Sequence, residues 1–84
     1  MLFGPEVRVL QEVTMREIEA VFAVTDRLGI SREALVIPLR PCAPGRVRRM
    51  PNGRIEIVAD ATDFPGFVES LEEALRSAGL VPSP

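Results

Sequence analysis

The first pattern of apolar and polar positions spans residues 14–28 and has the period of a helix. Thr14 begins it, Glu17 follows three residues later in the arrangement of a capping box, and Gly29 supplies a stop. Charged residues occupy much of the remaining surface, so the sequence predicts a helix with one apolar face. The positions on that face are Ile18, Val21, Phe22, Thr25 and Leu28.

A second helical pattern follows Thr62 and Asp63, which are both candidate N-cap residues, and runs to about Ala78. Pro65 lies in its first turn, where proline is tolerated, and Gly79 follows its end. This helix is also predicted to be amphipathic. Its inward stripe is Phe64, Phe67, Val68, Leu71 and Leu75, and its outer side carries Glu69, Glu72, Glu73 and Arg76.

Between the two helices the pattern is that of β structure. Pro38, Pro41 and Pro44 exclude a long helix, and residues 35–39 indicate a buried or edge strand. For residues 31–39 as a whole, the sequence is compatible with either a helix or a strand.

The strongest local signal is Asn52-Gly53, the preferred pair for a two-residue type I′ turn. It predicts a hairpin between residues 46–51 and 54–58. With this turn Met50 pairs with Ile55, Arg48 with Ile57 and Val47 with Val58. Arg49 then lies opposite Glu56 and forms the one cross-strand ion pair.

The opening and closing segments complete the expected fold. Val7, Val9 and Val13 favour a strand, although Pro5 could begin a helix continuous with the next one, so residues 5–13 are compatible with strand or helix. Residues 80–84 contain two prolines and are expected to form a flexible tail. We therefore expect one α+β domain over residues 1–84, in the order β-α-β-β-β-α. Its small, largely antiparallel sheet of three to four strands packs against two helices.

Composition restricts the chemistry of the chain. There is no His, Lys, Trp or Tyr among the 84 residues, which removes the commonest general base and metal ligand and the Schiff-base amine. A lone Cys42 cannot form an internal disulfide, and without a histidine base it makes a weak catalytic thiol. We therefore expect a protein that is not an enzyme and holds no cofactor or metal.

Carboxylates leave one enzymatic alternative, a hydrolase that uses Asp60, Asp63 or Glu56. The first two could also offer oxygen ligands to a metal, but two carboxylates just before a helix are typical of capping. Capping is the interpretation that we adopt for this pair.

No stretch approaches the roughly 20 apolar residues of a membrane span. Residues 1–5 lack the basic region and the long apolar run of a signal peptide, so we expect a cytoplasmic protein. All ten basic residues are arginine, which is typical of a GC-rich or thermophilic source and also of bidentate anion contacts.

Charge is segregated along the chain. Between Glu33 and Glu56 there are five arginines and no acidic residue, which gives this stretch a net charge of +5. The remainder has five arginines against twelve carboxylates, or −7, so that the total is −2. Such segregation attracts anions or complementary protein surfaces. The arginines of the basic stretch are Arg40, Arg46, Arg48, Arg49 and Arg54.

This segregation predicts a small interaction module that self-associates, its basic hairpin meeting the face of Glu69, Glu72 and Glu73 on another copy. An acidic partner protein would use the same arginines. The second use is binding to nucleic-acid phosphates, although a pI near 5.1 is far below that of most nucleic-acid modules. Apart from these two kinds of binding, the arginines could serve only to keep the sheet soluble and its edge unpaired.

Residues 23–35 contain the run Leu28-Gly29-Ile30-Ser31, in which an expected helix ends and a polar residue follows. This run resembles the helix-turn-helix of winged-helix DNA-binding domains, over about residues 16–58. The alternative interpretation is a helix C-cap followed by a loop or a short helical turn.

The resemblance implies a recognition helix that Ser31 would cap, with Arg32 and Glu33 approaching the bases. The hairpin of residues 46–58 would then be the wing. Pro38 and Pro41 limit the implied recognition helix to about two turns.

Overall fold

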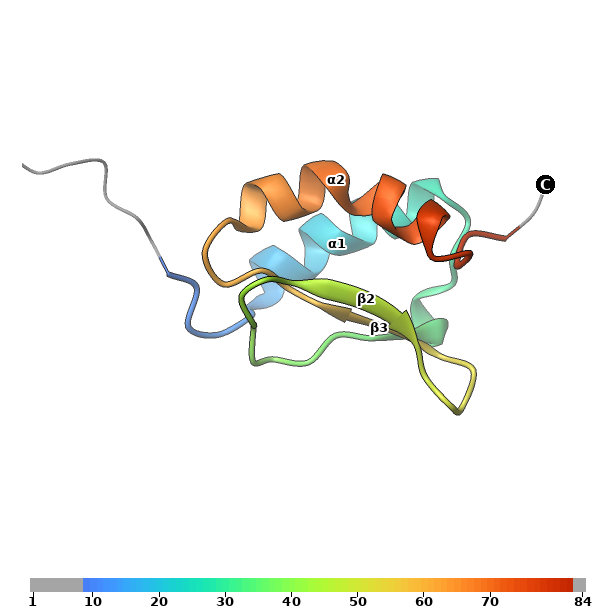
Figure 1. The fold of residues 1–84 in the computed structure, drawn as a ribbon, viewed down its shortest axis with the longest axis horizontal. Helices are drawn as coiled ribbons and strands as arrows, with labels where there is room; N and C mark the ends of the chain where they lie inside the picture. The colour runs from blue at the N-terminus through green and yellow to red at the C-terminus, as the bar shows by residue number, and fades with distance from the viewer. Residues whose placement is uncertain (1–8, 83–84) are drawn as a thin grey trace, which may run out of the picture.

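The computed structural model describes residues 9–82, which form two helices and a three-stranded sheet (Figure 1). Both helices lie on the same side of the sheet. This arrangement confirms the expected α+β class. In chain order the elements are α1 (Met15–Arg27), the 3-10 helix η1 (Arg32–Ala34), β1 (Leu35–Val36), β2 (Arg46–Arg49), β3 (Ile55–Val58) and α2 (Phe64–Ser77).

Both α-helices begin and end where their local signals predict. The Glu17 carboxylate accepts hydrogen bonds from the hydroxyl and from the backbone N–H of Thr14, the latter over 2.8 Å, and these bonds lower the pKa of Glu17. Asp63 is the N-cap of α2, and its Oδ1 accepts from the backbone N–H of Gly66 over 3.1 Å. Gly29, after α1, has φ +78°, the left-handed conformation that favours glycine.

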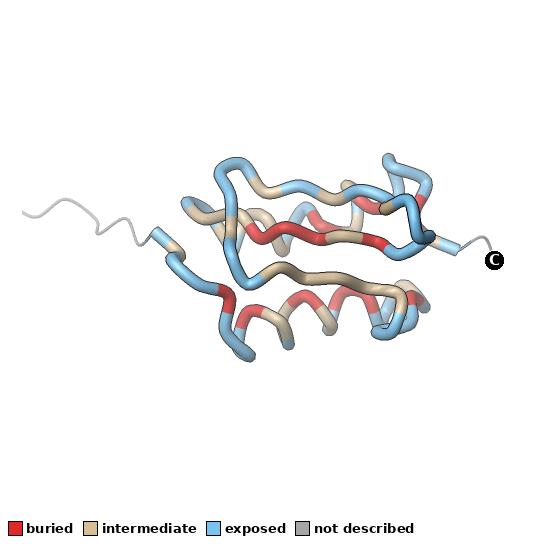
Figure 2. The backbone as a smooth tube through the Cα atoms, turned by 90° about the horizontal axis from the view of Figure 1, so that it is seen from below, coloured by how far each residue is buried: buried red, intermediate tan, exposed pale blue. Residues whose placement is uncertain are grey.

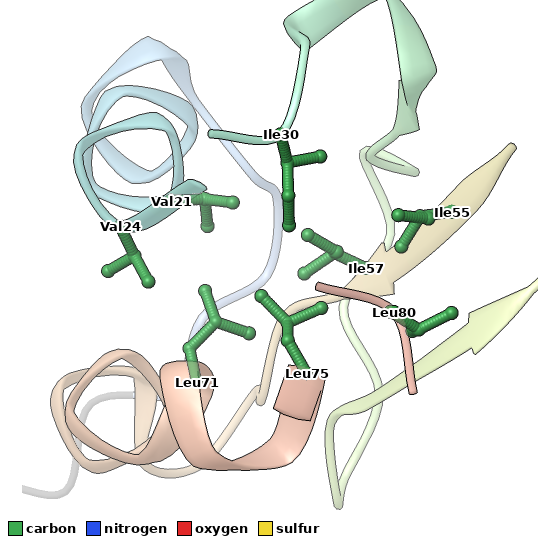
Figure 3. Packing of buried hydrophobic residues seen from close by; sticks show 8 residues of the cluster. All are labelled: Val21, Val24, Ile30, Ile55, Ile57, Leu71, Leu75 and Leu80. Atoms are coloured by element: carbon green, nitrogen blue, oxygen red, sulfur yellow. The ribbon is translucent and has the colours of Figure 1, made fainter. Parts of the chain in front are cut away.

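The core lies between the helices and the sheet (Figure 3). Its side chains point toward one another from both helices and from β3. Val24 belongs to this core although it lies outside the predicted apolar stripe, whereas Ile18, Phe22 and Leu28 of that stripe are only half-buried. The buried cluster comprises Val21, Val24, Ile30, Ile55, Ile57, Leu71, Leu75 and Leu80.

The sheet is mixed: its longer pairing is antiparallel, as expected, and its shorter pairing is parallel. Its strand order is β1-β3-β2, and β3 pairs antiparallel with β2 but parallel with β1. The parallel pairing continues past β1 as an isolated bridge between Cys42 and Asp60. The chain then crosses the end of β3 through residues 43–45 and returns along its other side as β2.

The hairpin register differs by one residue from the predicted one. Arg48 lies opposite Glu56, and Arg49 lies opposite Ile55. The expected ion pair between Arg49 and Glu56 is therefore wrong. Because side chains alternate between the two faces of a sheet, this slip exchanges the faces of every residue in β2 relative to β3.

The physical reason for the slip is the turn. The backbone N–H of Gly53 donates to the carbonyl of Met50 over 2.9 Å, so the two middle residues of the turn are Pro51 and Asn52. Only Gly53 has a positive φ here, +87°, which excludes a type I′ turn at Asn52-Gly53. Proline favours the second position of a type I turn, and a following glycine forms the bulge of a three-residue hairpin loop.

The opening segment forms neither of its two expected elements over the residues that the structure describes. Residues 9–13 have no regular secondary structure, and residues 5–8 of the expected element lie outside the described residues. Two backbone hydrogen bonds nevertheless attach this segment, from Leu10 N–H to the carbonyl of Ala61 over 2.6 Å and from Val13 N–H to that of Leu39 over 2.8 Å. The strand predicted for residues 9–13 is therefore wrong.

The closing segment begins with a buried residue. Leu80 is 4% exposed, lies in the core and donates its backbone N–H to the carbonyl of Leu75 over 2.9 Å. Of the tail expected over residues 80–84, the structure describes residues up to Pro82, which is exposed. Neither helix is long and apolar enough to cross a membrane, within residues 9–82.

Candidate partner-binding surface

Four of the five predicted arginines lie together. Three are on β2, and Arg54 follows the adjoining turn. Arg40 lies apart, in the segment that continues from β1 on the other side of β3. All five residues are exposed. We refer to the clustered residues as the arginine edge, which consists of Arg46, Arg48, Arg49 and Arg54.

The arginine edge presents charge to both sides of the sheet. Arg48 shares a face with its partner Glu56, whereas Arg49 shares a face with its partner Ile55, which points into the core (Figure 3). Arg46 and Arg48 therefore lie on the face that the helices leave open, which Figure 2 shows from below. Val47 and Arg49 lie on the helix side, where Val47 packs against the core.

Only one of these arginines is neutralised by a carboxylate within residues 9–82. Arg48 Nε donates to Glu56 Oε1 over 2.7 Å, and the Glu56 side chain is 14% exposed against 50% for that of Arg48. Arg49 contacts a carbonyl instead, its guanidinium donating to Gly53 O over 3.3 Å. Arg46 and Arg54 form no ion pair with a described residue. With Glu56 counted, the arginine edge retains a net charge of +3.

The predicted acidic face of α2 is partly neutralised. Glu69, Glu72 and Glu73 line an open depression on this helix together with Arg76. Glu72 Oε1 lies 3.3 Å from a guanidinium nitrogen of Arg27 in α1, and its Oε2 lies 3.1 Å from one of Arg76. Hydrogen bonds from Arg76 and Arg27 lower the pKa of Glu72.

Glu69 and Glu73 thus supply the charge that the acidic face keeps. Neither forms an ion pair with another residue in the described part of the chain. Helix α2 lies over one side of the sheet, and Arg46 and Arg48 lie on the other side (Figure 1). These two arginines therefore face away from the acidic face of α2, whereas Arg49 lies on the same side of the sheet as that helix.

The Asp60 carboxylate accepts hydrogen bonds from the backbone of the crossover and from that of the segment before α2. Its Oδ2 accepts from the backbone N–H of Gly45 over 3.1 Å, and its Oδ1 accepts from those of Thr62 and Asp63, each over 2.8 Å. These three backbone bonds lower the pKa of Asp60 to about 2. Together with the N-cap at Asp63, this geometry confirms the capping interpretation for Asp63 and gives Asp60 a related structural role.

Cys42 is exposed at the same end of the sheet. Its backbone N–H donates to the carbonyl of Ala59 over 3.0 Å, and its carbonyl accepts from the backbone N–H of Ala61 over 2.8 Å.

No group of three side chains that could bind a metal ion occurs within residues 9–82.

The segment after Ser31 does not form the recognition helix that the winged-helix resemblance implies. Ser31 Oγ accepts from the backbone N–H of Glu33 over 3.3 Å, but the helix that follows is the single 3-10 turn η1. The chain then becomes extended because Leu35 and Val36 pair with β3. The segment left open by the sequence is thus a short helical turn followed by a strand.

Arg32 has a role that the sequence analysis did not identify. Its guanidinium makes two hydrogen bonds to Asp26, over 2.7 and 3.2 Å, and its Cζ lies 4.5 Å from the centre of the Phe22 ring. Cation–π contact and a bidentate ion pair hold the turn after α1 against that helix. The six-residue separation of Asp26 and Arg32 lies outside the helical pair spacings of three and four, so no local signal in the sequence predicts this pair.

Comparison with protein-family models, with curated proteins and with solved structures found no match to this chain.

Proposed function

We propose that this chain is a non-enzymatic protein-association module whose arginine edge docks on an acidic protein surface. The main support is the charge of the arginine edge: Glu56 is the only carboxylate among the described residues that pairs with its four arginines, and a net charge of +3 remains. Exposed guanidinium groups with no internal partner are available for bidentate contacts with carboxylates of another protein.

A protein partner fits the charge distribution better than a nucleic acid does. The whole chain has a net charge of −2, and Glu69 and Glu73 carry negative charge elsewhere on the surface. A polyanion that extended beyond the arginine edge would meet repulsion, whereas a compact acidic patch would not.

The acidic face of α2 on a second copy is one such patch. Because Arg46 and Arg48 lie on the side of the sheet opposite to α2, each copy can use these arginines and its acidic face at once. The contact is then heterologous, and it joins copies head to tail. A chain of 84 residues buries only about 60–65% of its unfolded surface on folding, less than a larger domain does, so association would add useful stability.

The first experiment is light scattering after size exclusion, at tens of micromolar protein and at low and high salt. We expect a mass above that of the monomer at low salt and a decrease as salt rises, because exposed charge pairs are screened. The double variant Arg46→Glu/Arg49→Glu should be monomeric. Arg16→Glu/Arg40→Glu changes the charge equally at exposed positions outside the arginine edge and should associate nearly as the parent does, apart from the change in net charge.

Charge exchange makes this test specific. Glu69→Arg/Glu73→Arg should also be monomeric, and mixing it with Arg46→Glu/Arg49→Glu should restore association between the two variants. A parent chain that is monomeric at low salt would contradict self-association. Salt-sensitive binding to duplex nucleic acid that Arg46→Glu/Arg49→Glu abolishes, without any protein association, would contradict the proposed function itself.

A further inference from the structure

The outer edge of β2 is open. β3 is the central strand, and no strand lies beyond β2 among residues 9–82, where β2 forms the upper margin of the sheet in Figure 2. The strand at the other margin, β1, is only two residues long. The chain that continues from it is already partly covered, because the backbone N–H of Val13 donates to the carbonyl of Leu39. β2 is therefore the margin at which another strand can be added.

The register shows which backbone groups face outward. Met50 N–H donates to the Arg54 carbonyl over 2.7 Å, so Met50 and Arg54 belong to a hydrogen-bonded position of the antiparallel ladder. Such positions alternate with non-hydrogen-bonded ones. Arg48 and Arg46 are then bonded to β3, whereas Val47 and Arg49 are not. The N–H and C=O groups of Val47 and Arg49 consequently point away from β3.

A second copy of β2 is a poor occupant of this edge. Pairing two copies of the strand would bring three arginines beside three arginines. Like charges placed opposite each other destabilise a strand pair, and charged side chains on an edge strand are a known barrier to edge-to-edge association. The helix α2 is also unable to use the edge, since most of its own backbone groups are paired within the helix.

We propose that the outer edge of β2 binds an extended acidic segment of a partner protein as a fourth strand. This inference rests on the proposed function, and it specifies the partner. Strand addition supplies backbone hydrogen bonds for affinity, and alternate side chains supply specificity. Carboxylates opposite Arg46, Arg48 and Arg49 and a small apolar residue opposite Val47 would complement the edge.

The probe is a blocked synthetic peptide with the core Glu-Val-Glu-Glu-Val-Glu. Its sequence reads the same in both directions, so it presents the complementary pattern to β2 whether it binds parallel or antiparallel. The measurement is amide hydrogen exchange of the ¹⁵N-labelled full chain, with and without a saturating amount of peptide. In the free chain the amides of Val47 and Arg49 should exchange fast because they face solvent.

On binding, we expect the exchange of the Val47 and Arg49 amides to slow by about tenfold or more. The amides of Arg46 and Arg48 should change less, because they already donate to β3. Guanidinium Nε signals of the arginine edge should shift at the same time. If these Nε signals shift while both outward amides keep their fast exchange, strand addition is wrong and charge-driven docking stands.

A pair of variants separates backbone pairing from charge. Val47→Pro removes the outward-facing backbone N–H of residue 47 and leaves every charge in place. Proline is tolerated on an edge strand where the missing N–H would face solvent. The Val47→Pro variant should weaken peptide binding by about tenfold, the equivalent of one lost hydrogen bond. Val47→Ala trims the same side chain but keeps the N–H, and binding should change less than about threefold. Equal weakening by the two variants would contradict the inference.

Failure of the inference and failure of the proposed function are distinguishable. If the parent chain associates through the arginine edge in the scattering experiment but does not bind the peptide, only the strand addition is wrong. If the chain neither associates nor binds the peptide at low salt, the proposed function is wrong as well.

Discussion

Arg48 lies directly opposite Glu56 in the ladder of β2 and β3, and its Nε donates to Glu56 Oε1 over 2.7 Å. The neighbouring Arg49 instead lies opposite Ile55 and contacts the carbonyl of Gly53. A one-residue difference in register thus decides which arginine of the pair keeps its charge available. It also decides which of the two has outward-facing backbone groups.

A double-mutant cycle tests this register. We expect a coupling free energy of about 0.2–1 kcal/mol between Arg48→Ala and Glu56→Ala, the usual range for an exposed ion pair. The same cycle with Arg49→Ala and Glu56→Ala should give a coupling near zero, because these side chains lie on opposite faces. Urea unfolding of the four chains of each cycle provides the measurement. Coupling through Arg49 alone would instead support a type I′ turn.

The stability of the fold should depend on pH through Asp60. Its pKa falls from 3.8 to about 2 on folding, so the ionised form stabilises the native state above pH 3.8 and this contribution is lost as the pH falls toward 2. Asp60→Asn places an amide donor against the Gly45 N–H, and we expect it to cost about 1–3 kcal/mol at neutral pH. Denaturant unfolding against pH is the measurement.

The difference between the parent chain and Asp60→Asn should shrink as the pH approaches 2. Asp63→Asn is the matched control, since asparagine is as good an N-cap as aspartate. Its stability should follow that of the parent chain within a few tenths of a kcal/mol at neutral pH. A difference for Asp60→Asn that stays constant from neutral pH to pH 2 would contradict the role of the Asp60 charge.

Gly45 should tolerate no side chain. A Cβ there would lie 2.7 Å from the backbone nitrogen of Asp60 and from the carbonyl oxygen of Val58. We expect Gly45→Ala to destabilise the fold by about 1–3 kcal/mol or more, because backbone atoms must move. Gly29→Asn should cost less, since the space around Gly29 is open and asparagine tolerates a positive φ.

Gly45→Ala and Asp60→Asn act on the same contact, because the added Cβ would displace the backbone whose N–H donates to Asp60. Their combined effect on the free energy of unfolding should therefore be smaller than the sum of the separate effects. Thermal or urea unfolding of the two single variants and the double variant measures this. Strict additivity would indicate that the two residues act independently.

Two leucines allow a matched test of the core. Leu71 is fully buried between the helices and β3, whereas Leu39 is 57% exposed. Leu71→Ala should cost about 2–5 kcal/mol, which is a large part of the stability of a small domain. Leu39→Ala should change stability by no more than about 0.5 kcal/mol. Similar losses for both variants, measured by urea unfolding, would contradict this assignment of the core.

The helices could be predicted from the sequence because their signals are local. Thr14 with Glu17 and Asp63 with Pro65 are capping patterns within one turn, and each marks a helix that the structure contains. The parallel pairing of β1 with β3 has no such signal. This pairing depends on a crossover near Gly45, where the backbone passes too close to β3 for a side chain. The need for glycine there cannot be predicted from the sequence, because it depends on the packing of distant segments.

The arginine edge was partly predictable for the same reason. Arg46, Arg48 and Arg49 are adjacent in sequence and share a strand, so their clustering follows from the hairpin. Arg40 lies on the far side of β3 because the crossover separates it from them. The neutralisation of Glu72 by Arg27, 45 positions away, depends on helix packing and could not be predicted from spacing.

Cys42 sits beside Asp60, at the end of β3 opposite to the turn that precedes Ile55. Five residues of extended chain span about 17 Å, which separates this thiol from the loop that carries Arg54. A fluorophore attached to the single cysteine of the natural sequence would therefore test the proposed docking by depolarisation while leaving the turn end of the arginine edge unlabelled. No residue would have to be added or removed to obtain a singly labelled protein.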